Sequence, residues 1–70
     1  MDIKIEFRPD DGPPQTLYAD LPRDEVKDLE AATKDPSRAE DVVQIPARVE
    51  KNGRAKPLLF RVGRIKIRRA

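Results

Sequence analysis

The chain contains no cysteine, no histidine and no tryptophan. Without cysteine it can form neither a disulfide nor a thiolate metal site. Without histidine it lacks the commonest metal ligand and the usual general base of catalysis. Its three isolated glycines do not make a glycine-rich phosphate loop. We therefore expect no metal site, no cofactor, no enzyme activity and no pocket for a small-molecule substrate.

Long apolar runs are also missing. No stretch approaches the roughly 20 apolar residues that span a bilayer, so we expect no membrane span. The first residues alternate charged and aliphatic side chains instead of forming the apolar centre of a signal peptide. These absences make the cytoplasm the expected location. With 70 residues, the chain is expected to form one domain over residues 1–70.

The N-terminal residues show the alternation of a half-buried strand. Over residues 2–8 the side chains of Ile3, Ile5 and Phe7 share one face, and the residues between them are charged. The proline-rich segment 9–14 ends this strand because proline cannot donate to a ladder. Residues 15–19 have the composition of a short returning strand.

A helix is predicted over residues 22–34. Val26, Leu29, Ala32 and Thr33 recur at helical spacing, which gives a narrow apolar stripe. Proline suits the first turn, and Pro36 stops the helix by restricting the residue before it. Asp20 is the best candidate for the N-cap.

The second half of the chain carries a hairpin signal. Segments 42–50 and 55–62 flank Asn52 and Gly53, the preferred pair for a two-residue type I′ turn. Such a turn sets the register of the two strands. The apolar pairs it predicts are Val43 with Val62, Ile45 with Phe60, and Ala47 with Leu58.

The two prolines of this hairpin test the register. In the predicted register Pro46 lies opposite Leu59, and Pro57 lies opposite Arg48. Both prolines fall in non-hydrogen-bonded pairs, where a missing N–H is tolerated. After Val62 the apolar alternation changes parity, and a bulge or tight bend at Gly63 would restore it. Residues 64–69 then continue the hairpin or form a separate last strand.

Together these elements predict an α+β fold. A small, mostly antiparallel sheet would carry one helix on its apolar face, in the order strand, short strand, helix and three further strands. The predicted core is spread over all of these elements. Its members are Ile3, Ile5, Phe7, Val26, Leu29, Val43, Ile45, Leu58, Phe60, Val62, Ile65 and Ile67.

The charges are unevenly distributed along the chain. Residues 1–41 have a net charge of −6 and residues 42–70 a net charge of +8. Such asymmetry is typical of proteins with an anionic or acidic partner. The candidate binding residues are the cations of the second hairpin and the last strand: Arg54, Lys56, Arg61, Arg64, Lys66, Arg68 and Arg69.

Two interpretations of these cations compete. Lysine and arginine on strand edges commonly prevent aggregation, and the acids of the first strand could neutralise part of the patch. Alternatively the patch binds a partner. An exposed apolar strip at Val42 and Leu59 favours a protein or a second copy of the chain as that partner.

Nucleic acid is the alternative partner for the same residues. Three cations would lie about 6–7 Å apart along one face of the last strand, a spacing that suits the phosphates of a nucleic-acid backbone. They are Arg64, Lys66 and Arg68. The three aromatic residues are too few for a base-stacking surface, and the helix is acidic. We therefore expect a small non-catalytic interaction module that binds a protein partner or itself, with sequence-nonspecific nucleic-acid binding as the alternative function.

Overall fold

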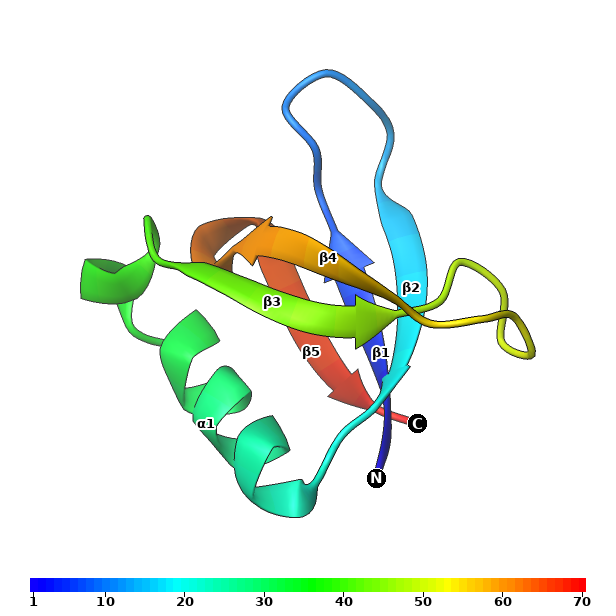
Figure 1. Ribbon diagram of the computed structural model, residues 1–70. Helices are drawn as coiled ribbons and strands as arrows, with labels where there is room; N and C mark the ends of the chain where they lie inside the picture. The colour runs from blue at the N-terminus through cyan, green and yellow to red at the C-terminus, as the bar shows by residue number, and fades with distance from the viewer.

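The computed structural model describes residues 1–70 and shows an α+β fold of five strands and one α-helix (Figure 1). In chain order the elements are β1 (Asp2–Phe7), β2 (Gln15–Asp20), α1 (Arg23–Thr33), the 3-10 turn η1 (Pro36–Arg38), β3 (Val42–Ala47), β4 (Lys56–Arg61), the 3-10 turn η2 (Val62–Arg64) and β5 (Ile65–Arg69). The strands form two antiparallel sheets, one in the order β2-β1-β5 and one of β3 and β4. The predicted fold class and element order are confirmed.

The first hairpin follows its alternation. On β1, Ile3 and Ile5 are buried while Lys4 is exposed. The returning strand β2 pairs with β1 and buries Leu17 and Ala19 beside them. The inner face of this sheet is therefore apolar and its outer face is polar, as expected for an antiparallel sheet with one solvated side.

Helix α1 buries Val26 and Ala32 and keeps Leu29 half buried, which confirms the predicted stripe. The N-cap prediction was wrong. Pro22 occupies the N-cap position, and no side chain caps the helix. Asp20 lies in β2, where its carboxylate accepts a hydrogen bond of 2.9 Å from the Met1 ammonium group. That bond lowers the pKa of the Asp20 carboxyl.

The second hairpin forms, but its predicted register was wrong by two residues. The observed pairs are Val43 with Phe60, Ile45 with Leu58, Pro46 with Pro57, and Ala47 with Lys56. Because a shift of two residues preserves the faces of a strand, the predicted apolar residues still point to the core. The strands are shorter than predicted, so residues 48–55 form a loop.

The predicted register was wrong because Asn52 and Gly53 do not form a type I′ turn. That turn requires positive φ at both residues, and no residue of the chain has a positive φ. Instead, the Gly53 N–H donates to the Glu50 carbonyl at 2.9 Å. Directly after β3, Arg48 exchanges two backbone hydrogen bonds with Tyr18 of β2, at 2.7 and 2.8 Å. This pair joins the two sheets.

Both prolines of the hairpin lie in a non-hydrogen-bonded pair, as predicted, although they oppose each other and not Leu59 and Arg48. The Val62 N–H donates to the Asp41 carbonyl at 2.9 Å, which sets the alternation of the ladder. Even-numbered residues of β3 therefore point their N–H and C=O groups away from β4. The missing N–H of Pro46 costs the hairpin nothing.

Gly63 lies at a tight bend in η2, where the parity of the apolar residues changes. Its N–H donates to the Ala39 carbonyl at 2.9 Å. After the bend, β5 is a separate last strand that pairs with β1. The core lies between the two sheets and α1, and Phe7 and Phe60 connect the sheets through an edge-to-face contact with ring centroids 5.5 Å apart.

Candidate binding surface

The outer face of β1 and β5, together with the residues beyond their adjoining ends, gathers five cations. Strand alternation turns Ile3, Ile5 and Ile65 inward, so the residues between them face solvent. The resulting surface, here called the basic face, consists of Lys4, Arg8, Arg64, Lys66 and Arg68. Two strands that are distant in sequence therefore build one charged surface.

Like charges lie directly opposite each other on this face. Lys4 pairs with Arg68 in the register of β1 and β5. Arg8 lies beside Arg64, since its N–H donates to the Arg64 carbonyl at 2.9 Å. Like charges in opposite positions destabilise an antiparallel pair. Only Glu6, opposite Lys66, interrupts the row of cations.

Acidic neighbours neutralise part of the basic face. Glu6 Oε1 accepts from Arg68 Nε at 2.7 Å, and Asp10 forms an ion pair with Arg64. Both pairs involve exposed or half-exposed side chains, so water screens them and each contributes little to stability. Lys4, Arg8 and Lys66 form no ion pair.

A hollow adjoins the basic face along the free edge of β5. It has a volume of about 480 Å³, and Arg8, Arg64 and Lys66 line it together with Lys34 from the end of α1. Glu6 and Glu30 also line it. The hollow therefore carries a net positive charge, because four cations and two acids line it.

The other predicted binding residues lie elsewhere. Arg54 is in the loop between β3 and β4, and Lys56 begins β4. Arg61 ends β4 and pairs with Glu40, with 3.6 Å between Nη1 and Oε2. Arg69 lies on the opposite side of the sheet from Lys66 and Arg68, because its Nη2 contacts Glu30 Oε1 of α1 at 2.9 Å. The Arg69 guanidinium lowers the pKa of the Glu30 carboxyl.

The structure thus brings together three of the seven predicted residues, Arg64, Lys66 and Arg68. It adds Lys4 and Arg8, which were not among the predicted binding residues. The alternation over residues 2–8 already placed both on a solvated face. Their position opposite the last strand depends on the pairing of β1 with β5, for which the sequence holds no local signal.

None of the helices has the length and apolar character that a membrane crossing requires. No group of three or more acidic side chains could hold a metal ion. No protein-family model, no curated protein and no solved structure matches the chain.

Proposed function

We propose that this protein is a small non-catalytic interaction module whose basic face binds an acidic segment of a partner protein. One observation carries the proposal: Lys4 opposes Arg68, and Arg8 opposes Arg64, in an antiparallel strand pair. Opposed like charges destabilise an antiparallel pair. Here Arg68 pairs with Glu6 and Arg64 with Asp10, which leaves Lys4 and Arg8 without a counter-ion. An anionic partner would relieve that repulsion, so the arrangement favours binding.

Several features favour a protein over a nucleic acid. Tyr18 is the only aromatic residue on the outer side of this sheet and is half buried. The rings of Phe7 and Phe60 pack against each other between the sheets. The face therefore lacks the aromatic surfaces on which single-stranded bases stack. Nucleic-acid binding through the same cations is the alternative function.

An NMR titration tests the proposal. The ¹⁵N-labelled protein is titrated with a short capped poly-glutamate peptide, and separately with a short DNA and a short RNA duplex, at low and physiological salt. We expect the peptide to shift amides in β1 and in segment 64–68. Tighter binding of a duplex, with a log K that falls by roughly 0.7–0.9 per phosphate neutralised as log salt rises, would instead establish the nucleic-acid alternative.

A matched pair of variants locates the site. Lys4→Ser/Lys66→Ser removes two exposed cations of the basic face that form no ion pair. Arg54→Ser/Lys56→Ser removes the same charge from the hairpin loop and the start of β4. We expect the first variant to weaken peptide binding by about five- to tenfold and the second to change it by less than about twofold. Equal losses in both variants would contradict a site on the basic face.

A further inference from the structure

The edge of β3 that faces away from β4 has unpaired backbone groups. Its even-numbered residues point their N–H and C=O groups to that side, because the ladder with β4 uses the odd-numbered ones. Arg48, just beyond β3, satisfies its groups on Tyr18 of β2. No strand accompanies β3 further. The N–H groups of Val42 and Gln44 and the carbonyls of Val42, Gln44 and Pro46 therefore remain free for another strand.

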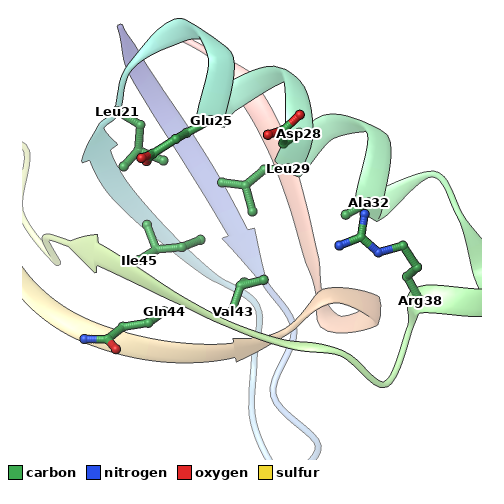
Figure 2. A pocket seen from close by; sticks show the side chains of 9 residues that line it. All are labelled: Leu21, Glu25, Asp28, Leu29, Ala32, Arg38, Val43, Gln44 and Ile45. Carbon is green, nitrogen blue, oxygen red and sulfur yellow. The ribbon is translucent and has the colours of Figure 1, made fainter.

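A groove runs along this free edge because β2 turns away from β3 into α1. The groove has a volume of about 320 Å³ and lies between α1 and β3 (Figure 2). Its apolar lining comes from both elements and from the segment before the helix: Leu21, Leu29, Ala32, Val43 and Ile45. Figure 2 shows Leu29 and Ala32 pointing from the helix toward Val43 and Ile45 of the strand. An extended chain on the edge of β3 would place alternate side chains into this groove.

The edge of β3 differs from the other free strand edges in its lack of charge. β4 carries Lys56 and Arg61, and β5 carries Lys66, Arg68 and Arg69. Charged side chains on an edge hinder pairing with another chain. β3 has the sequence Val-Val-Gln-Ile-Pro-Ala and contains no charged residue. It is thus the only strand of the protein without a charged side chain.

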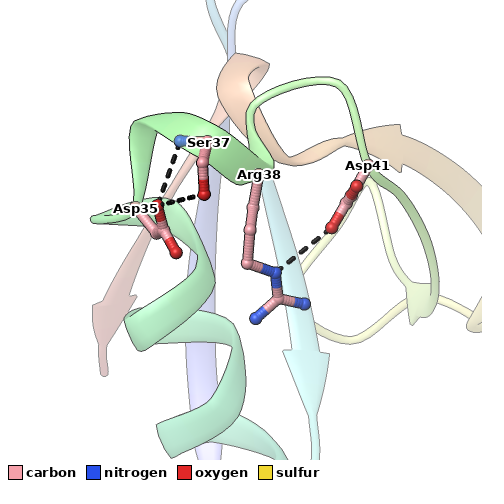
Figure 3. Close-up of polar contacts among 4 residues, drawn as sticks. All are labelled: Asp35, Ser37, Arg38 and Asp41. Atoms are coloured by element: carbon pink, nitrogen blue, oxygen red, sulfur yellow. Dashed lines mark hydrogen bonds and ion pairs between the residues drawn. The ribbon is translucent and has the colours of Figure 1, made fainter.

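The groove has an acidic side on the helix. Glu25 and Asp28 line it from α1, are exposed and form no ion pair. At the other end of the groove, Arg38 Nε donates to Asp41 Oδ2 at 3.2 Å, so its charge is already balanced (Figure 3). The unbalanced charge of the groove is therefore negative, which favours a cationic occupant and disfavours a nucleic acid.

We propose that the free edge of β3 binds an extended segment of a partner protein, which adds a strand to the β3–β4 sheet. The segment carries small apolar residues for the groove and a lysine or arginine that contacts Glu25 and Asp28. Only an extended backbone can pair with the free groups of Val42 and Gln44, so a helical segment does not suit this site. The site is separate from the basic face and does not depend on the function proposed above.

The proposal can be tested with three synthetic peptides. The first is a short capped peptide that alternates valine and threonine and carries one lysine at each end. The second replaces both lysines with glutamate. The third keeps the lysines but has alternate backbone nitrogens methylated, which removes the hydrogen bonds to an added strand. We expect the first peptide to shift the amide signals of Val42 and Gln44 and to slow their hydrogen exchange, and the other two to bind at least about tenfold more weakly.

Protein variants separate the backbone contribution from that of the charges. Gln44→Pro removes an N–H that points away from β4, and Pro46 shows that this strand accepts proline in the same orientation. Gln44→Ala keeps the N–H and is the matched control. We expect the proline variant to fold but to lose about tenfold in affinity for the lysine peptide, while the alanine variant binds as the unaltered protein does. Glu25→Gln/Asp28→Asn should weaken binding by about two- to fivefold.

Three outcomes would overturn the proposal. The first is that the lysine peptide produces no shift at Val42 and Gln44. The second is equal affinity of the proline and alanine variants. The third is a change of these two amide signals on simple dilution of the free protein, which would make a second copy of the chain the occupant of the groove.

Discussion

At the scale of single residues, Arg48 and Tyr18 connect the two sheets. Their two backbone hydrogen bonds hold β3 against β2 over one residue pair only. Before this pair, β3 and β2 diverge and α1 covers the core between them. The same pair therefore closes one end of the groove and leaves the rest of the β3 edge free.

Gly63 shows how little room one position can have. A Cβ atom at this residue would lie 2.9 Å from the Cβ of Ala39 and 3.0 Å from its carbonyl oxygen. Gly12 is a suitable comparison because a Cβ atom there would meet only Pro9 Cγ at 3.6 Å, an ordinary van der Waals distance.

We expect Gly63→Ala to lower the free energy of unfolding by about 1–3 kcal/mol, because η2 and the segment around Ala39 must move apart. Gly12→Ala should change it by less than about 0.5 kcal/mol. Urea denaturation followed by circular dichroism measures both values. Equal stability of the two variants would mean that the bend at Gly63 adapts without cost.

At the scale of elements, the sequence patterns predicted those strands and helices whose formation depends on residues close together in the chain. The alternation over residues 2–8 and the stripe containing Val26 and Leu29 identified β1 and α1, because burial of one face dominates both elements. The proline after the helix also ended it near the predicted residue. Apolar alternation placed the correct faces of β3 and β4 toward the core.

Features that depend on distant residues were not predictable. Asn52 and Gly53 predicted a register that the second hairpin does not adopt. The bridge between Arg48 and Tyr18, which are about thirty residues apart in sequence, also had no local signal. The candidate binding surface was only partly predictable for the same reason. The last strand suggested Arg64, Lys66 and Arg68, whereas Lys4 and Arg8 join them only through the pairing of β1 with β5.

The observed hairpin loop leads to a specific expectation for Asn52. Asparagine is preferred in a type I′ turn because it tolerates positive φ, where alanine costs about 1–2 kcal/mol. Asn52 has no positive φ in this loop and is exposed. We therefore expect Asn52→Ala to change the free energy of unfolding by less than about 0.5 kcal/mol in urea denaturation. A loss above about 1 kcal/mol would indicate that the protein in solution adopts the tight turn.

At the scale of the whole molecule, the two oppositely charged halves of the chain contact each other. Four ion pairs connect an acid of the first half with an arginine of the second: Glu6 with Arg68, Asp10 with Arg64, Glu30 with Arg69, and Glu40 with Arg61. All of these acids must be ionised to pair. The charge asymmetry that suggested a partner therefore also serves the fold, and only the cations without an ion pair remain fully available for binding.

This arrangement makes stability depend on pH in a defined direction. The contact with Arg69 lowers the pKa of Glu30, and hydrogen bonds from Ser37 lower the pKa of Asp35 (Figure 3). A carboxyl whose pKa is lower in the folded protein binds fewer protons there than in the unfolded chain, so stability rises with pH. This contribution is fully present above the unfolded carboxyl values of about 4. It is lost as the pH falls through the lower values of the folded protein.

We expect the urea midpoint to fall between neutral and acidic pH, and Glu30→Gln to reduce that fall. Glu50→Gln is the matched control, because Glu50 is exposed and forms no ion pair. It removes the same charge but no ion pair, so it should reduce the fall less than Glu30→Gln does. Urea denaturation near pH 7 and near pH 3 measures the difference.

The ¹³C NMR titration of the Glu30 carboxyl gives its pKa directly. In Arg69→Ala that pKa should rise toward the usual value for glutamate, because the guanidinium that favours the ionised form is gone. An unchanged pKa would show that the ion pair between α1 and β5 does not persist in solution.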